Sequence, residues 1–170
     1  MTCKVLGWWS MKKFRKVAVG GTFDELHRGH RVLLTKAFEI GERVAIGLCS
    51  DKFAAKMGKP HVTAPYAERL KELEAFLKDL GVSGRAEFVP LDDPFGTTLS
   101  GSCIEALVVS EETRSVALRI NEKRREAGLP QLKIVTVAMV PSENCTPIST
   151  TKIRSGEIDR EGHVLKPRKF

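Results

Sequence analysis

The chain has 170 residues, the size of one ordinary domain, and 42% of them are hydrophobic and 29% charged, as in a globular protein with a core. No apolar run approaches about 20 residues, which excludes a transmembrane helix, and the first residues lack the apolar core and cleavage site of a signal peptide. The four cysteines form no CxxC pair and fit no zinc spacing, so we expect free thiols in a cytoplasmic protein. They are Cys3, Cys49, Cys103 and Cys145.

The net charge of +7 is concentrated at the two ends of the chain. Residues 1–16 carry five basic residues and no acid, and residues 163–170 carry three, whereas residues 17–162 hold 20 basic and 21 acidic residues. A nucleic-acid site normally needs a basic face with aromatic side chains, and only 6% of this chain is aromatic. We therefore predict a neutral body over 16–162, a basic extension over 1–15 and a basic tail from 163, with no nucleic-acid or membrane partner.

Short apolar runs alternate along the chain with segments of helical spacing. The predicted strands are residues 16–19, 43–48, 87–91, 106–109 and 132–140. The predicted helices are residues 31–40, 65–80 and 112–127, with a short helix from Ser149, and Gly41 is expected to close the first of them as a C′ glycine. A lysine-bearing loop is expected after the second strand. This alternation predicts a single α/β domain, a doubly wound (Rossmann-like) five-stranded parallel sheet, with ligands beyond the carboxyl ends of the strands.

The segment with the most candidate functional residues, GGTFDELHRGH, follows the first strand at residues 20–30. Two glycines directly after a strand let the backbone approach a ligand closely. His27 and His30 lie three residues apart at the start of a helix, where they share a face, and Gly29 leaves that face open. The helix N-terminus favours a phosphate. The segment is neither a Walker loop nor a GxGxxG motif, and no other His or Cys is placed as a third zinc ligand, so we predict no metal site in the protein itself.

GGTFDELHRGH resembles the HxGH signature of the nucleotidyltransferase superfamily, and residues 148–154, ISTTKIR, resemble its second signature. Within the superfamily, residues 16–162 resemble the phosphopantetheine adenylyltransferases of archaeal and eukaryotic type. The matching stretches are Pro65-Tyr66 with Arg69, residues 90–96, residues 108–113, Ile120-Asn121 with Arg124, and residues 156–159. The chain departs from the family pattern at Thr150, at Lys152 and in the loop 142–145.

The resemblance implies a catalytic domain that transfers AMP from ATP to 4′-phosphopantetheine, giving dephospho-CoA and pyrophosphate, with Mg²⁺ accompanying ATP. It implies three catalytic residues, His30, His27 and Lys56. The implied nucleotide-binding residues are Gly20, Gly21, Thr22, Phe23, Asn121, Arg124, Ser149, Thr150, Thr151 and Arg154. The implied substrate-binding residues are Thr22, Asp24, Lys56 and Arg69.

Several roles have alternatives that the sequence leaves open. Lys52 and Lys59 compete with Lys56 for the bridging position between the two substrates. Asp24 fits a plain turn residue, and Arg69 fits an ion pair with Glu72. Ser149 also fits an ordinary helix cap.

The sequence also allows other interpretations of the function. One is another HxGH adenylyl- or cytidylyltransferase, with FMN, nicotinamide mononucleotide or glycerol 3-phosphate as acceptor. Another is a nucleotide-binding regulator without catalysis. The sequence does not fix the oligomeric state, and a monomer is among the alternatives.

Overall fold

The computed structural model describes residues 12–100 and 103–165. Five parallel strands form one sheet in the order β3-β2-β1-β4-β5, which confirms the predicted α/β fold. The strands are β1 (Phe14–Gly21), β2 (Gly41–Cys49), β3 (Ala86–Leu91), β4 (Ala106–Ser110) and β5 (Lys133–Val137). The helices are α1 (Arg28–Ile40), α2 (Asp51–Lys56), α3 (Tyr66–Asp79), α4 (Arg114–Glu126) and α5 (Thr150–Arg154), with short 3₁₀ turns at Ser83–Arg85 and Gly96–Leu99.

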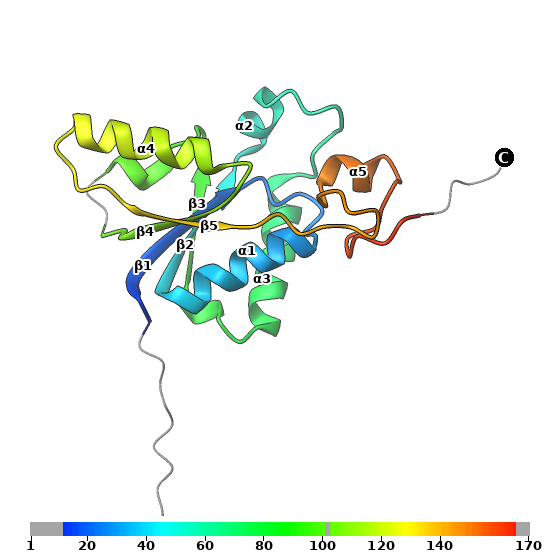
Figure 1. Ribbon diagram of the computed structural model, residues 1–170, viewed down its shortest axis with the longest axis horizontal. Helices are drawn as coiled ribbons and strands as arrows, with labels where there is room; N and C mark the ends of the chain where they lie inside the picture. The colour runs from blue at the N-terminus through cyan, green and yellow to red at the C-terminus, as the bar shows by residue number, and fades with distance from the viewer. Residues whose placement is uncertain (1–11, 101–102, 166–170) are drawn as a thin grey trace, which may run out of the picture.

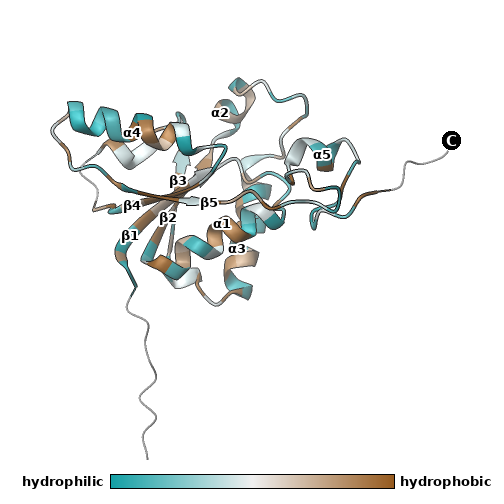
Figure 2. Ribbon diagram, viewed as in Figure 1, coloured by the Kyte–Doolittle hydropathy of each residue, from teal (hydrophilic) through white to brown (hydrophobic). Residues whose placement is uncertain are grey.

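The sheet is covered on both faces, with α1 and α3 on one face and α4 on the other (Figure 1). Each face has its own hydrophobic cluster. The larger cluster joins the strands to α1 and α3, and the smaller one joins them to α4. Because both faces are buried, the inner strands are apolar over their central residues, whereas β1 and β2 carry charged residues near their starts (Figure 2).

Strand β1 lies at the centre and determines where the site forms. It pairs with β2 on one side and with β4 on the other, so the strand order reverses beside it. A crevice opens at such a switch point, outside the carboxyl ends of the strands. The Gly20-Gly21 end of β1 therefore opens into the crevice where a ligand is expected.

Two predictions about the elements around this end are corrected by the structure. Gly41 does not close α1 in the left-handed conformation: its φ is −108°, and it is the first residue of β2. Its missing side chain matters for packing, because a Cβ there would lie 2.6 Å from Cγ2 of Val17. The lysine-bearing segment after β2 is not all loop. Ser50 caps the six-residue helix α2, its hydroxyl accepting the N–H of Phe53.

The two ends of the body differ slightly from the predicted boundaries. Phe14 and Arg15, placed in the basic extension, belong to β1. Near the other end, Val164 pairs with Ile158, so this part of the predicted tail is folded onto the body. Residues 1–11, with Cys3, and residues 166–170 lie outside the described residues.

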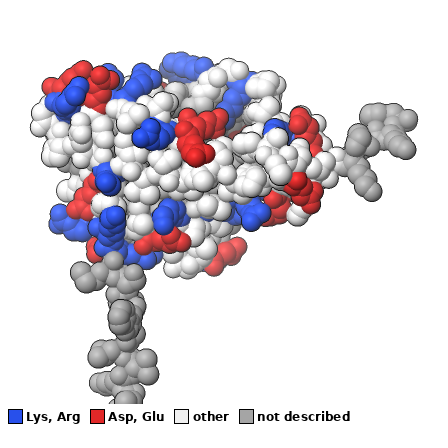
Figure 3. Space-filling view, viewed as in Figure 1, with Lys and Arg blue, Asp and Glu red and all other residues white. Residues whose placement is uncertain are grey.

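The described cysteines are free, Cys49 being buried and Cys103 and Cys145 exposed. Within residues 12–100 and 103–165, no helix has the length and apolarity needed to cross a membrane. On the face seen in Figure 3, basic and acidic side chains are interspersed.

Candidate active site

The loop between β1 and α1 has an unusual backbone. Phe23 and Glu25 have φ values of 48° and 51°, a region that side chains other than glycine seldom enter. Each such residue costs about 1–3 kcal/mol, so the surrounding structure must hold it in place. The ring of Phe23 is 1% exposed and contacts the ring of His30 edge-on, at 5.3 Å between centroids. The loop thus holds a fixed backbone conformation that places Phe23 against the ring of His30.

His27 and His30 stack on each other, with ring centroids 3.7 Å apart and an angle of 20° between the planes. His27 is the N-cap of α1, and its Nδ1 accepts the backbone N–H of His30 at 3.4 Å. Because Nδ1 is an acceptor, the proton of the neutral ring lies on Nε2, which can donate to a ligand. A Cβ on Gly29 would lie 3.0 Å from Cε1 of His27, so the glycine makes room for the stacked ring.

Both histidines are neutral at pH 7. Burial lowers the pKa of His27 to about 4, with further lowering by the nearby charges of Arg31, Lys59 and Arg160. Burial, together with His27 and Lys59, holds the pKa of His30 well below its usual range. The imidazoles therefore approach a ligand as neutral hydrogen-bond donors, and a polyanion beside them would favour their protonation.

Asp24 joins three parts of the chain. Its carboxylate is fully buried, accepts two hydrogen bonds from Arg154 at 2.8 and 2.9 Å, and accepts the N–H of Ala64 at 3.1 Å. The hydroxyl of Thr150 donates to its carbonyl at 3.0 Å. Burial would raise the pKa of Asp24, but these hydrogen bonds outweigh burial and the net pKa is lowered. Asp24 is thus an ionised anchor between the histidine loop, α5 and the segment before α3.

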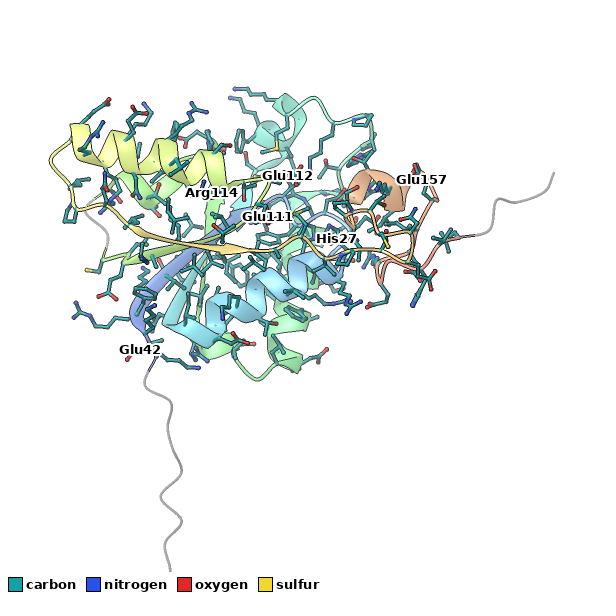
Figure 4. All side chains as sticks on the ribbon, viewed as in Figure 1. His27, Glu42, Glu111, Glu112, Arg114 and Glu157 are labelled. Carbon is teal, nitrogen blue, oxygen red and sulfur yellow. The ribbon has the colours of Figure 1, made fainter. Side chains whose placement is uncertain are left out.

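A polar hollow of about 230 Å³ opens beside the histidines. Its walls come from the carboxyl ends of β1, β4 and β5 and from the starts of α1 and α5, and Figure 4 shows His27 and Glu112 at this end of the sheet. The predicted site residues that line it are Gly20, Gly21, Thr22, Phe23, His27, His30, Ser149, Thr150 and Thr151. Ser149 also caps α5, accepting the N–H of Lys152, so both of its predicted roles are compatible with the structure.

The structure brings Lys59, rather than Lys56, to the histidines. Lys59 lines the polar hollow, and its Nζ lies 3.4 Å from the hydroxyl of Thr22. Lys56 is exposed at the end of α2 and does not line the polar hollow. Lys52, in the first turn of α2, is likewise exposed. The spacing along the chain could not distinguish the three lysines, because the path of the segment after α2 decides which of them turns inward.

Three other predicted site residues hold the scaffold in this structure. Arg69 is 1% exposed and donates to the carbonyls of Thr22, Cys49 and Ala64 at 2.7–2.8 Å. Its ion pair is with Asp51 and not with Glu72, which corrects that alternative.

Asn121 exchanges two hydrogen bonds of 2.8 Å with the backbone of Leu132. Arg124 is 4% exposed and donates to the carbonyls of Pro130 and Thr98. Neither residue lines the hollow at the histidines, so their assignment to the nucleotide stays a prediction.

Two residues near the site were not predicted from the sequence. Arg160 pairs with Glu25 at 2.7 Å and with Glu72 at 3.1 Å, and its carbonyl accepts the N–H of Arg28 at the start of α1. His61 lies 3.6 Å from the carboxylate of Asp24. Neither belongs to a recognisable motif, and their partners lie far away in the chain.

A second, apolar cavity of about 170 Å³ lies on the α4 side of the sheet. It is lined by Leu91, Phe95 and Ile120 among other apolar residues, and it extends to Gly20 and Gly21. The same two glycines line the polar hollow. The two spaces therefore lie next to each other at the end of β1.

The comparisons with known proteins agree with this geometry. A model of the family described as cytidylyltransferase-like matches residues 18–156. The chain is 48% identical to a phosphopantetheine adenylyltransferase of Methanothermobacter thermautotrophicus, covering 91% of this chain and 92% of the relative. It is 47% identical to the enzyme of the same name from Methanopyrus kandleri, covering 88% and 94%.

Among solved structures, a protein of unknown function from Archaeoglobus fulgidus superposes with a TM-score of 0.65 at 39% identity, over 72% of this chain and 88% of that one. The sequence matches extend along nearly the whole body and include both the histidine loop and α5. The chain therefore belongs to the cytidylyltransferase-like family and, within it, to the phosphopantetheine adenylyltransferases.

Proposed function

We propose that this protein transfers the adenylyl group of ATP to the phosphate of 4′-phosphopantetheine, giving dephospho-CoA and pyrophosphate. The observation that carries the proposal is that two unlike spaces are both lined by Gly20-Gly21. One is lined by two histidines, a lysine and hydroxyl groups together with apolar side chains, and the other is mainly apolar. A reaction between a triphosphate and a phosphate on an aliphatic arm needs such a pair of spaces.

The polar hollow suits the nucleotide. The start of α1 presents the positive end of the helix dipole, which favours phosphates. His27 and His30 offer ring N–H donors beside it. Val137 and Ile148 also line the hollow and supply apolar surface on which a base can lie. The hollow thus offers polar groups for the triphosphate and apolar surface for the adenine.

The apolar cavity suits the arm of the acceptor. Segment 90–96, one of the stretches that resemble the family, contributes Leu91, Pro94 and Phe95 to its wall. Tyr66, from another of these stretches, does not line it; its ring lies against Arg69, 5.8 Å from the guanidinium carbon. An arm in this cavity would direct its phosphate toward Gly21, Thr22 and Lys59, beside the polar hollow.

The chemistry needs alignment and charge stabilisation more than proton transfer. An oxygen of the acceptor phosphate attacks the α-phosphorus of ATP, the bond from that phosphorus to the bridging oxygen of the β-phosphate breaks, and pyrophosphate leaves. The attacking phosphate is already ionised at neutral pH, so no general base is required. Lys59 would hold the attacking phosphate, while His27 and His30 would stabilise charge on the transferring and leaving groups.

Mg²⁺ would enter with ATP. Within the described residues no group of three His, Cys, Asp or Glu side chains is arranged to hold a metal ion. Glu112 lines the polar hollow and offers one carboxylate. This donor set fits an ion that is held mainly by phosphate oxygens and water, as Mg²⁺ commonly is, and that neutralises charge on the triphosphate.

The reaction needs only small-molecule substrates, ATP and the phosphorylated acceptor, and it would take place in the cytoplasm. A protein partner is not required, since one chain supplies both spaces. This is compatible with a monomer.

Steady-state assays of pyrophosphate release test the assignment. ATP is combined in turn with 4′-phosphopantetheine, unphosphorylated pantetheine, FMN and nicotinamide mononucleotide. Pantetheine lacks the attacking atom and should give no turnover. The two flat-ringed acceptors fit the apolar cavity poorly, and their kcat/KM should be at least about 10³-fold lower. If FMN or the mononucleotide matches phosphopantetheine, the choice of acceptor is wrong while the adenylyl transfer stands.

A further inference from the structure

His61 is buried in a way that the proposed reaction does not explain. It lies in the segment between α2 and α3, and its side chain is 10% exposed. Neither ring nitrogen has a hydrogen-bond partner within the part of the chain that the structure describes. A buried polar group without a partner costs about 1–3 kcal/mol, so its presence calls for a reason.

A carboxylate close to the ring points to that reason. Nε2 of His61 lies 3.6 Å from Oδ2 of Asp24, just beyond hydrogen-bond length. The carboxylate already holds Arg154 of α5, and it accepts the N–H of Ala64 from the same segment as His61. An approach of less than 1 Å would give the segment a second bond to Asp24.

The other end of this segment carries the lysine of the site. Lys59 is two residues before His61, and its Nζ lies 3.4 Å from the hydroxyl of Thr22, again a long contact. Gly58 precedes it with φ of +62°, and a Cβ there would meet nothing within 4 Å, so no packing contact holds the chain at this residue's α-carbon. Ala64 is well held, because its carbonyl accepts from Arg69 at 2.7 Å and its N–H donates to Asp24. The segment is thus fixed at Ala64 and loosely held at Lys59.

We propose that His61 is a positioning residue that draws the segment 58–63 onto Asp24 and so holds the ammonium group of Lys59 against the acceptor phosphate. Nε2–H of His61 donates to Oδ2 of Asp24 when the segment closes. Because Asp24 also holds Arg154, the same carboxylate then connects the acceptor side of the site to α5 on the nucleotide side. The proposal rests on the proposed function in assigning the acceptor phosphate to Lys59.

Two substitutions at position 61 test the bond, with a neighbour as control. His61→Leu removes the donor, whereas His61→Gln places an amide N–H near the position of Nε2. A misplacement near 1 Å costs about 10²-fold in rate, so we expect His61→Leu to lower kcat/KM for phosphopantetheine about 10-fold or more. KM for ATP should change less than about twofold, since the substitution removes no group that binds the nucleotide. His61→Gln should restore most of the activity, and Val62→Ala, at a residue 86% exposed, should match wild type.

A double-mutant cycle with Lys59→Met shows whether His61 acts through the lysine. In the Lys59→Met background, His61→Leu should cause no further loss, because the group that it positions is gone. The proposal is overturned if the losses in kcat/KM of the two single variants multiply in the double variant. It is also overturned if His61→Gln is as slow as His61→Leu, or if His61→Leu keeps the wild-type kcat/KM. If His61→Leu does not fold, His61→Asn replaces it. The asparagine side chain is polar but shorter, so its amide cannot reach the position of Nε2 and cannot make the bond to Asp24.

Trypsin cleavage after Lys56 gives a readout that needs no turnover. This bond lies at the start of the segment, so a loosened segment should be cut faster in His61→Leu than in wild type or His61→Gln, at equal thermal stability. Equal cleavage rates in all three proteins would refute the closure of the segment. If the wild-type protein shows no adenylyl transfer, the proposed function is refuted. The role of His61 would still be decided by the cleavage rates, which need no turnover.

Discussion

Gly29→Ala should separate the activity of this protein from its stability. Gly29 lies in the first turn of α1, between the stacked histidines in sequence and directly against His27 in space. An alanine Cβ at this position would lie 3.0 Å from Cε1 and 3.1 Å from Nδ1 of His27. Both distances are shorter than a comfortable van der Waals contact of about 3.5 Å or more, so the ring of His27 must move by a few tenths of an ångström.

The two consequences of the substitution have opposite signs. Alanine is favoured over glycine inside a helix by about 0.5–1 kcal/mol, which raises stability. The movement of His27 disturbs its stack with His30 and the position of its Nε2–H. Since a misplacement near 1 Å costs about 10²-fold, a few tenths of an ångström should cost about 3- to 10-fold in kcat. We therefore expect a protein that is equally or more stable and yet slower.

Thermal unfolding and pyrophosphate release, measured on the same preparations, check this expectation. Gly84→Ala is the matched control, because a Cβ there would meet nothing within 4 Å and the residue is far from the histidines in the fold. It should leave kcat unchanged. Wild-type kcat in Gly29→Ala would show that the contact with His27 does not govern the rate, and a lowered melting temperature would show that the ring cannot move as reasoned.

Three further predictions concern the histidines and the extension. His30→Ala should lower kcat by about 10²–10⁴ with little change in melting temperature, since the ring meets charge that develops in the transition state; a near wild-type kcat would remove His30 from the mechanism. The pKa of His27 is about 4 in the free protein, and a bound triphosphate should raise it. ATP binding should therefore take up protons at pH values above about 4 and tighten as pH falls toward that value, which calorimetry in buffers of different ionisation enthalpy measures; zero proton uptake would contradict it. A chain that starts at Met11 should keep its turnover, and loss of activity in a folded, soluble product would implicate residues 1–10.

Hydrophobic patterning was sufficient to predict the sheet, because an apolar run of strand length has few ways to be buried. The five strands and their alternation with helices follow from this patterning. The rule for doubly wound sheets then places the ligand at Gly20-Gly21. The histidine motif was equally visible, since its residues are adjacent in sequence. Helix α2 was missed although Ser50-Asp51 is a reasonable start signal, because six residues give too little periodicity to recognise.

Pairings between distant residues could not be predicted in the same way. Asp24 and Arg154 are 130 positions apart, and nothing local in either segment indicates that they meet. Arg69 and Arg124 show the same limit. Arginine is usually exposed, so a single sequence favours a ligand or solvent for it, whereas here both guanidinium groups bind backbone carbonyls in the interior.

The buried arginine at position 69 also explains how a strained loop can persist. Phe23 and Glu25 each occupy a costly backbone region, and the chain between them must be held by contacts made elsewhere. Arg69 binds the carbonyl of Thr22 before the loop, Arg154 binds the carboxylate of Asp24 within it, and Arg160 binds the carboxylate of Glu25. Three arginines from α3, α5 and the segment after α5 thus hold the loop at positions 22, 24 and 25. Since these three arginines bind the loop and not the rings, losing one of them should misplace the stacked histidines through the loop that supports them.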